Sequence, residues 1–386
     1  MDNNLTAIVQ EHNVRIFKDE SIYDVISTIL EGAVSDDPFF VVDVAEVIRQ
    51  FERWRELLPA VEPHYAVKCN SDEVILKTLA SVGCCFDVAS KGEITSVLAV
   101  TTPDKLIFAN PIKNLESLKY ARAVDVDLMT FDSEVELYKV VLYHPNADLI
   151  MRLKVDDHSS RCKFSAKFGA DADDVERLLG VAKTLSLRVC GFSFHVGSGC
   201  VEPQLYESAI RQCLAAVDMA RTRFALDVSV VDLGGGFESE TFAEFAEVIR
   251  PLTEQRPDIR WLAEPGRLFV NDCSTLVLNV VGKKKADSVN VYYLNDSVYG
   301  SFNGIMFDHK KPQIQAFNER DGVQHASRVY GCTCDGIDLL TDQVMLPDLA
   351  VGESCYVERM GAYSASAASS FNGFSHTKSV YVLTNR

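Results

Sequence analysis

Short apolar segments alternate with amphipathic segments along most of the chain between residues 64 and 266. The apolar segments are HYAVKCN (64–70), FDVAS (86–90), IFAN (107–110), LMTF (128–131), LIMRLKV (149–155), VCGFSFHVG (189–197), VSVVDLGGG (228–236) and IRWLAEPG (259–266). Helical spacing of apolar residues fills most intervals, at 72–82, 115–124, 134–141, 172–185, 205–220 and 242–252. Eight buried strands that alternate with helices predict parallel βα units, and eight such units in about 200–250 residues are typical of a (β/α)8 TIM-type barrel. A doubly wound open sheet is the structural alternative, but no G-x-G-x-x-G opens the first unit.

The pattern differs on both sides of this region. PFFVVDV (38–44) predicts a strand, 45–58 has helical spacing, and a short helix is expected near Tyr23–Leu30. Beyond residue 270 the segments STLVLNVVGKKK, SVNVYYLND, HASRVYG, ESCYVERMGAY and KSVYVLTN are β-rich and have no helices between them. We therefore expect an α/β protein with a barrel at 38–270 and an antiparallel β domain, a β-sandwich or Greek-key barrel, built from 1–37 and 271–386.

Charge and composition narrow the classes of partner. The 386 residues carry a formal net charge of -17, which disfavours nucleic acid and anionic membrane surfaces. No apolar run is long enough to cross a bilayer, and the polar N-terminus has no signal-peptide core. The 11 cysteines are scattered with no spacing of a zinc site, so we expect no metal and reduced thiols in the cytoplasm.

Polar residues fall where the predicted strands end. These residues are Lys68, Asp87, Asn110, Arg152, His195, Gly234–Gly236, Glu264 and Arg267. The carboxyl ends of barrel strands meet at one face, which carries the active site in enzymes of this fold. Convergence of so many chemically active groups predicts a site for a small molecule at that face.

Lys68 is the central candidate, because a buried ammonium needs a partner or a reason to be neutral. A lysine at a strand end can bond covalently to a carbonyl cofactor, or it can simply extend its charge into solvent. Glu264 could hold a proton on a pyridine nitrogen or pair with Arg267. His195 could stack on a cofactor ring or be a hydrogen-bonded core histidine. Arg152 is a strand-end cation best explained by a carboxylate partner.

The glycines Gly234–Gly236 could bind an anion through backbone N–H groups or could form a flexible turn. Arg267 and the hydroxyl of Ser198 could bind the same anion. The loops after strands seven and eight are a frequent phosphate site in barrels.

The motifs YAVKCN, FDVASKGEI, HVGSG, LGGGF, EPGR, VYGSFN, FDH, CDGID, MGAY and FNGF occur in this order from about residue 38 to 375. Together they closely resemble the eukaryotic ornithine decarboxylases, group III pyridoxal-phosphate (PLP) decarboxylases with an alanine-racemase-like barrel. The combination of YAVKCN with CDGID is highly specific, whereas GGG or EPGR alone would not be. The resemblance implies PLP-dependent conversion of ornithine to putrescine and CO2, the first step of polyamine biosynthesis.

The resemblance also implies roles for individual residues. Lys68 would hold PLP covalently, Glu264 would face its pyridine nitrogen and His195 would stack on its ring. The implied phosphate ligands are Ser198, Gly235, Gly236, Arg267 and Tyr363, with supporting charges at Asp87, Glu93 and Arg152. Cys334 would protonate the product carbanion. The implied substrate-binding residues are Asp308, Asp335, Phe371 and Tyr299.

Cys334, Asp335 and Phe371 come from the partner subunit in that family, so the resemblance implies a homodimer with shared active sites. Phe307 and Cys332 depart from the family pattern, and Cys332 matches related viral arginine decarboxylases. Arginine or lysine decarboxylation therefore remains an alternative. A non-catalytic protein of the antizyme-inhibitor type is another, since residues 116–141 resemble the antizyme-binding stretch of animal relatives. An amino-acid racemase on the same barrel would not require the Asp308/Asp335 pair.

Overall fold

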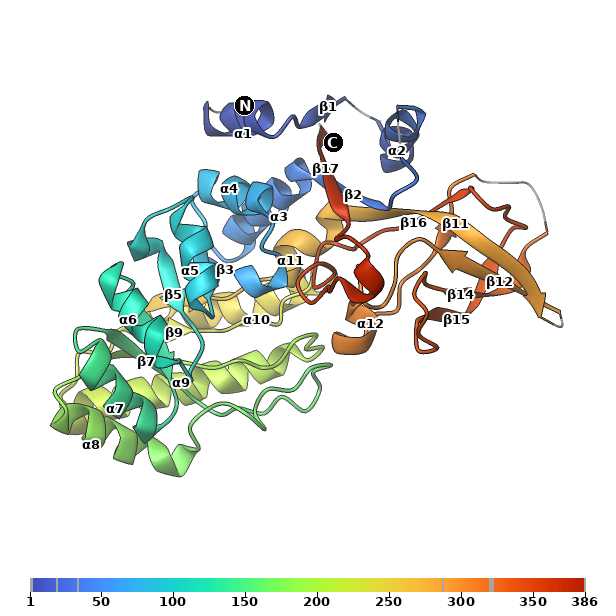
Figure 1. Ribbon diagram of the computed structural model, residues 1–386. Helices are drawn as coiled ribbons and strands as arrows, with labels where there is room; N and C mark the ends of the chain where they lie inside the picture. The colour runs from blue at the N-terminus through green and yellow to red at the C-terminus, as the bar shows by residue number, and fades with distance from the viewer. Residues whose placement is uncertain (1–2, 19, 33–34, 287, 319–322, 385–386) are drawn as a thin grey trace. The chain divides into compact units, whose positions relative to one another are not determined.

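The computed structural model describes residues 3–18, 20–32, 35–286, 288–318 and 323–384. The chain divides into two compact units (Figure 1). The first consists of Met1–Ile48 with Val270–Arg386, and the second of Arg49–Phe269. From sequence we placed these divisions at residues 38 and 270.

The second unit contains a closed barrel of eight parallel strands, as predicted. The strands are β3 (Val61–Ala66), β4 (Cys85–Val88), β5 (Leu106–Phe108), β6 (Leu128–Phe131), β7 (Asp148–Arg152), β8 (Arg188–Ser193), β9 (Val230–Asp232) and β10 (Arg260–Ala263). They neighbour each other in chain order, and β10 closes the barrel on β3. Most are shorter than their apolar segments. Lys68, His195 and Glu264 lie one or two residues beyond the ends of β3, β8 and β10, whereas Asp87 and Arg152 lie within β4 and β7. β3 ends at Ala66, and a 3-10 turn at Val67–Cys69 follows it.

Helices follow the barrel strands (Figure 1). They are α4 (Glu73–Ser81), α5 (Lys91–Leu98), α6 (Leu115–Ala123), α7 (Glu134–Tyr143), α8 (Val175–Thr184), α9 (Pro203–Phe224) and α10 (Phe242–Glu254), and α3 (Val44–Leu57) precedes β3. Side chains cap several helices: Asp72 accepts from the N–H groups of Val74 and Ile75 at the start of α4. Helix α5 was not predicted, because only Ile94 and Val97 of its eight residues are buried and the apolar signal is weak.

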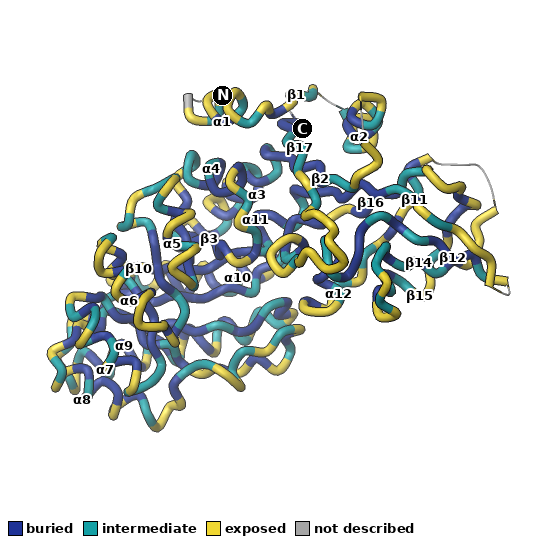
Figure 2. The backbone as a smooth tube through the Cα atoms, viewed as in Figure 1, coloured by how far each residue is buried: buried dark blue, intermediate teal, exposed yellow. Residues whose placement is uncertain are grey.

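The inside of the second unit is apolar, with the buried residues following the barrel strands (Figure 2). Ile107, Ile150, Val230 and Leu262 come from four different strands and form one cluster. Trp54 of α3 stacks on Phe242 and donates its indole N–H to the carbonyl oxygen of Val61 at 2.9 Å. Without this hydrogen bond, burial of the large ring would leave the indole N–H with no acceptor.

A buried ion pair joins the loop before α6 to α7. Lys113 Nζ lies 3.0 Å from Glu136 Oε1, donates to the carbonyl oxygens of Thr130 and Asn110, and is fully buried. Burial lowers the pKa of Lys113 to about 8.

Lys113→Met is expected to reduce the free energy of unfolding by about 3 kcal/mol. The carbonyl oxygens of Thr130 and Asn110 lose their charged donor, and Glu136 keeps only Lys139 as a cationic partner. Urea unfolding measures this loss. The matched variant Lys119→Met removes an exposed ion pair with Glu116 and should change stability far less; equal losses in both variants would contradict the argument.

The first unit is organised on a nine-stranded sheet. Its strands are β1 (Arg15–Phe17), β2 (Phe39–Asp43), β11 (Ser274–Ala286), β12 (Val289–Leu294), β13 (Gln315–Ala316), β14 (His325–Tyr330), β15 (Leu339–Leu346), β16 (Ser354–Val357) and β17 (Lys378–Thr384). The sheet is mixed rather than purely antiparallel, because β17 lies parallel to β1 and β2, and β12 lies parallel to β14. Local alternation of residues could not reveal this, since parallel partners here are distant in sequence. The strand β2, which we assigned to the barrel region from sequence, pairs with β11 and β17.

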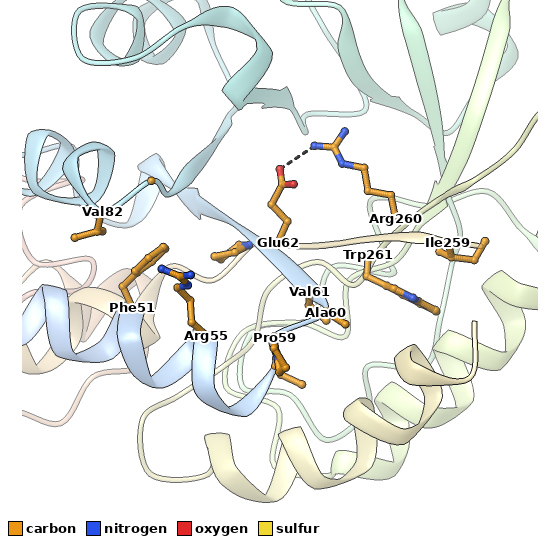
Figure 3. Close-up of a pocket in the computed structure, with 13 residues that line it drawn as sticks. Phe51, Arg55, Pro59, Ala60, Val61, Glu62, Val82, Ile259, Arg260 and Trp261 are labelled. Carbon is orange, nitrogen blue, oxygen red and sulfur yellow. Dashed lines mark hydrogen bonds and ion pairs between the residues drawn. The ribbon is translucent and has the colours of Figure 1, made fainter. Parts of the chain in front are cut away.

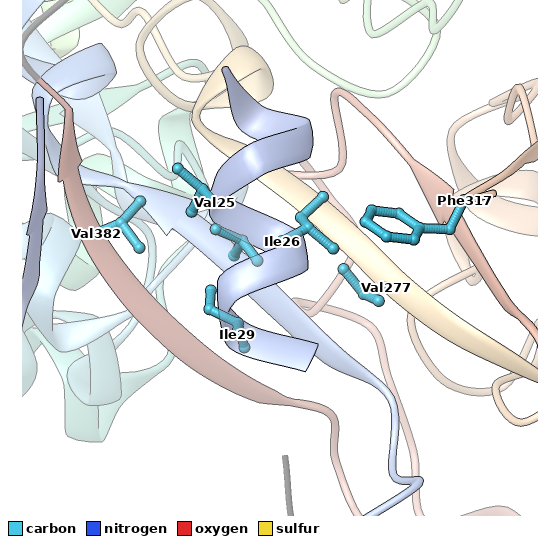
Figure 4. Packing of buried hydrophobic residues seen from close by; sticks show 7 residues of the cluster. Val25, Ile26, Ile29, Val277, Phe317 and Val382 are labelled. Carbon is cyan, nitrogen blue, oxygen red and sulfur yellow. The ribbon is translucent and has the colours of Figure 1, made fainter. Parts of the chain in front are cut away.

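Four helices belong to or border this unit: α1 (Asn3–Glu11), α2 (Ile22–Glu31), α11 (Arg267–Val270) and α12 (Gly304–Phe307). Helix α2 covers the expected apolar segment. It begins with a capping box in which the side chains of Ser21 and Asp24 each accept the other's backbone N–H. Its residues Val25, Ile26 and Ile29 pack on the sheet (Figure 4). The cluster is completed by Val41, Val277, Phe317 and Val382.

Among the described residues, none of the helices combines the length and the apolar character that crossing a bilayer requires.

Candidate active site

Lys68 lies just beyond the carboxyl end of β3, on the 3-10 turn. Its Nζ donates to Asp87 Oδ2, and the β3–β4 ladder places Asp87 beside Ala66. The Asp87 side chain is fully buried, whereas that of Lys68 is 41% exposed. Asp87 Oδ1 is also buried and has no hydrogen-bond partner in the described part of the chain. A buried carboxylate therefore holds an ammonium that a ligand can reach from outside.

Glu93 secures the loop after β4. Its Oε2 accepts the N–H of Ala89 at 2.6 Å, while its own N–H binds the hydroxyl of Ser90, the N-cap of α5. Burial raises the pKa of Glu93, and the nearby Asp87 adds to this shift. The residue therefore supports the loop beside Asp87.

Glu264 follows β10 directly and shares a hydrogen bond with Asp232, the last residue of β9. Burial raises the pKa of Glu264 well above its usual range, and the carboxylates of Asp232 and Asp87 raise it further. Burial also raises the pKa of Asp232, to about 6. Two buried carboxyl groups this close hold one proton between them. Asp232 was not predicted as a site residue, although its position at a strand end was a usable signal.

Arg152, the last residue of β7, balances these carboxyl groups. Burial lowers the pKa of its guanidinium, whereas Glu264, Asp132 and Asp232 favour its charged form. The guanidinium carbon also lies 5.1 Å from the centre of the Phe168 ring. The expectation that a carboxylate environment accompanies Arg152 agrees with this arrangement.

His195 lies two residues beyond β8. Its Nδ1 accepts the N–H of Gly197 at 3.0 Å, and the Phe164 ring meets it edge to face at 4.9 Å. Burial lowers the pKa of His195 well below its usual range, and Arg152 and Lys68 lower it further. The imidazole is therefore neutral, with its proton on Nε2.

The glycines after β9 allow three loops to meet closely. A Cβ atom on Gly235 would lie 2.7 Å from the carbonyl oxygen of Glu264, and one on Gly236 would lie 2.6 Å from that of Gly197. Gly236 also has a φ of +116°, which other residues rarely adopt. The loops after β8, β9 and β10 therefore approach each other only because side chains are absent here.

Arg267 and Ser198 lie at the same group of loops. Arg267 Nη2 donates to Ser198 Oγ at 3.4 Å, and its Nε lies 3.2 Å from Glu238 Oε1. A guanidinium, a hydroxyl and glycine-rich backbone together are the donors that a phosphate group requires.

Three predicted substrate-binding residues, Tyr299, Asp335 and Phe371, lie in the first unit with the predicted catalytic residue Cys334. The hydroxyl of Tyr299 donates to Asp335 Oδ2 at 2.5 Å, and its ring stacks on Phe371 with centroids 4.1 Å apart. The N–H of Cys334 binds Asn372 Oδ1 at 3.0 Å. The Cys334 side chain is exposed and, with Asp335, lines a pocket of about 310 Å³.

Asp308 and Tyr363 form another part of that unit. Asp308 caps the C-terminus of α12, where its N–H binds the carbonyl oxygen of Gly304 at 2.9 Å. A Cβ on Gly304 would lie 3.4 Å from the carbonyl oxygen of Tyr363, so α12 and this segment pack together. Phe307, one of the two departures, is 70% exposed. The ligand roles of all these residues remain predictions.

The barrel residues suit PLP in their chemistry. The Asp87–Lys68 pair offers an amine for a carbonyl group, and the shared Asp232–Glu264 proton suits a ring nitrogen. The backbone of the glycine loop, with Arg267 and Ser198 at the same group of loops, offers donors for a phosphate group. Neutral His195 offers a flat ring.

Comparison with known proteins agrees with this reading. Residues 44–271 match the family model described as "Pyridoxal-dependent decarboxylase, pyridoxal binding domain". The chain is 41% identical to the ornithine decarboxylase of Schizosaccharomyces pombe, covering 95% of this chain and 89% of that protein. It is 42% identical to antizyme inhibitor 2 of Xenopus laevis, covering 90% of this chain and 81% of that protein.

Among solved structures, the arginine decarboxylase of Paramecium bursaria Chlorella virus superposes with a TM-score of 0.91 at 36% identity, covering 94% of this chain and all of that one. Fold, strand-end chemistry and sequence therefore agree, and the chain belongs to the pyridoxal-dependent decarboxylase family that includes the eukaryotic ornithine decarboxylases.

Proposed function

We propose that this protein is an ornithine decarboxylase, which converts L-ornithine to putrescine and CO2 as the first step of polyamine biosynthesis. The observation that carries the proposal is the Lys68–Asp87 pair beside the Asp232–Glu264 proton at the carboxyl end of the barrel. The 41% identity to a curated ornithine decarboxylase over nearly the whole chain supports the substrate.

PLP, when bound, delocalises the electron pair left by the departing CO2. Lys68 would hold its carbonyl carbon, and Glu264 would keep a proton at the pyridine nitrogen with help from Asp232. His195 would cover one ring face. Ser198, Gly235, Gly236, Arg267 and Tyr363 would bind the phosphate, with Asp87, Glu93 and Arg152 as supporting charges. Cys334 would return a proton to the substrate carbon.

The distal ammonium of the substrate would be held by Asp308 and Asp335. Asp308 is buried, and burial of a carboxylate is costly without a cation, so this aspartate favours a compact ammonium within reach. Tyr299 and Phe371 would form the wall of the substrate pocket next to Asp335. Their rings stack on each other, and the Tyr299 hydroxyl donates to the Asp335 carboxylate. Arginine is the main competing substrate, because the chain is 36% identical to a viral arginine decarboxylase.

We expect kcat/KM to rank ornithine above lysine and lysine above arginine. One added methylene in a fitted pocket costs about 1–3 kcal/mol of transition-state binding, and the longer, flat guanidinium should fit worse. Release of CO2 from each amino acid, with and without added PLP, measures the order. Faster turnover of arginine than of ornithine would overturn the assignment and make Cys332 the better guide.

Asp308→Glu is expected to shift preference toward arginine. The longer carboxylate occupies more of the distal pocket and reaches a different cation position. The readout is the ratio of kcat/KM for arginine to that for ornithine, with Asp342→Glu as a control on an exposed aspartate that pairs with Arg328. A ratio unchanged in Asp308→Glu would remove Asp308 from the distal site.

A homodimer with active sites shared across its interface would supply Cys334, Asp335 and Phe371 from the partner chain. The exposure of Cys334 and Phe371 in the single chain supports this proposal, because a second copy would cover them. A cytoplasmic location is supported by the 11 cysteines, all of which lie in the described residues as free thiols.

The second candidate is a non-catalytic protein that binds antizyme. Its support is the 42% identity to antizyme inhibitor 2 and the exposed Val135, Tyr138 and Leu142 of α7, within or next to the stretch that resembles an antizyme-binding segment. The presence of Lys68, Cys334 and Asp335 favours catalysis instead. A visible absorbance band of bound PLP, together with CO2 release, separates the two candidates.

A further inference from the structure

A second group of reactive side chains lies at the amino ends of the barrel strands. Glu62 and His64 are near the start of β3, whereas Lys68 follows its carboxyl end. Here a pocket of about 590 Å³ opens between α3 and the first residues of β3 and β10 (Figure 3). Glu62 and Arg260 both line it, and their side chains point toward each other.

The fold brings Glu62, His64 and Cys85 together. Glu62 and His64 are two residues apart on one strand, so their side chains share a face. The β3–β4 ladder pairs His64 directly with Cys85. The Cys85 thiol donates to Glu62 Oε1 at 3.1 Å, and His64 Nε2 lies 3.6 Å from the same oxygen. One ligand atom from each of the three residues lies within 4.8 Å of the others.

The two ring nitrogens of His64 both face oxygen atoms of Glu62. Nδ1 lies 3.4 Å from its backbone oxygen and Nε2 lies 3.6 Å from its Oε1. In the neutral tautomer that carries the proton on Nδ1, Nε2 is an acceptor that faces another acceptor, Glu62 Oε1. A cation between the two atoms would remove this mismatch, and metal-bound histidines commonly donate their other N–H to a carbonyl oxygen.

The dimensions suit a tetrahedral ion. Zinc bonds of about 2.0–2.3 Å to nitrogen, oxygen and sulfur place neighbouring ligand atoms about 3.3–3.7 Å apart. The separation of 3.6 Å between His64 Nε2 and Glu62 Oε1 lies in this range. The separation of 3.1 Å between Cys85 Sγ and Glu62 Oε1 is slightly below it, so these two atoms move apart as the ion binds. We propose that Glu62, His64 and Cys85 bind a divalent ion of the zinc class at the amino end of the barrel, with its fourth position open toward the pocket. The Cys85 thiol releases its proton to solvent as the sulfur–metal bond forms.

Arg260 is the group that opposes binding. Its Nη2 donates to Glu62 Oε1 at 2.8 Å, and its positive charge repels a cation. Its side chain is 48% exposed, so it can withdraw into solvent as the ion enters. Removing this charge should therefore strengthen binding, an effect that a purely structural cluster would not produce.

The test is a titration of the PLP-loaded protein with Zn²⁺ in competition with a zinc-binding dye. The expected result is one ion bound per chain in the parent. Cys85→Ser and Glu62→Gln should each reduce the affinity for Zn²⁺ by about 100-fold or more. Loss of a residue that only supports a ligand already reduces metal affinity by about 10–100-fold. Glu62 is 37% exposed, so Glu62→Gln keeps the test valid should Cys85→Ser fail to fold. Arg260→Gln should bind more tightly than the parent.

The matched control is Cys190→Ser, which changes a thiol on β8 of the same barrel that donates to the carbonyl oxygen of Leu149. It should bind Zn²⁺ as the parent does. A parent protein that does not bind one Zn²⁺ per chain would overturn the proposal. So would unchanged affinity in both Cys85→Ser and Glu62→Gln, because the ion would then sit at another thiol such as the exposed Cys334. Neither the number of bound ions nor their affinity is measured through turnover, so the result is independent of the proposed decarboxylation.

Discussion

Lys68→Ala is expected to abolish decarboxylation, with kcat reduced by at least about 10³-fold. Lys68 provides the amine at the strand-end site, and its Nζ is held by a fully buried carboxylate, Asp87. Among the described residues no other lysine pairs with Asp87, so no neighbour can replace it. CO2 release from saturating ornithine measures the loss, and the visible absorbance of the bound cofactor should disappear with it.

The control for that experiment is Lys119→Ala. Lys119 pairs with Glu116 on the exposed side of α6, so its removal should leave both turnover and cofactor absorbance at parental levels. Circular dichroism of Lys68→Ala establishes that the barrel is folded. Near-parental turnover by folded Lys68→Ala would show that the amine at this strand end is not the one that binds the cofactor.

Mixing Lys68→Ala with Cys334→Ala, each inactive alone, is expected to restore activity. Lys68 belongs to the barrel unit and Cys334 to the sheet unit. If each active site takes one residue from each chain of a dimer, a mixed dimer contains one intact site. Random exchange in an equal mixture makes half of the dimers mixed, so the activity should reach about one quarter of the parental value.

Two measurements make the mixing experiment decisive. Differently tagged chains purified in sequence isolate the mixed dimer, which should show about half of the parental activity per dimer. A mixture of Lys68→Ala with Asp87→Asn serves as the control. Both changes lie in the same part of one chain, so no combination rebuilds a site. Confirmed mixed dimers without activity would mean that each site is built within one chain.

The barrel was predictable because its signal is local. Each strand is an apolar run bounded by turn residues, and most intervals between strands carry a helical pattern. The limits of β3 were not predictable in the same way. The last residue of β3, Ala66, donates its N–H to the carbonyl oxygen of Pro265, which follows the neighbouring strand β10, and no local pattern records this long-range contact.

The sheet unit was predictable only in part, because its strand pairing depends on contacts between distant segments. Its strands were visible in the sequence, but the parallel pairs β2–β17 and β12–β14 depend on segments that periodicity cannot connect. The pairing of Phe39 with Lys378 joins segments near the two ends of the sequence, and so does the pairing of Arg15 with Val382. No local pattern records such a partner.

The residues of the candidate site also differ in whether local sequence or long-range contact reveals them. Strand-end position and motif identified Lys68, Asp87, His195 and Glu264, and the structure places them at the carboxyl end of the barrel. Asp232 escaped notice because it reads as part of an apolar strand before the glycines, and only its closeness to Glu264 reveals a shared proton. The contact between Tyr299 and Asp335 spans 36 residues, and side-chain geometry alone makes it visible.

The pairing of β2 with β17 sets an order of events during synthesis. The barrel segment, Arg49–Phe269, has left the ribosome long before Lys378–Thr384 is made. Until then one edge of β2 has no strand to bind, and exposed strand edges recruit other chains. The nascent protein would therefore carry a folded barrel and an open template for aggregation at the same time. Holdase chaperones that recognise extended apolar segments should be most needed until Lys378–Thr384 has left the ribosome.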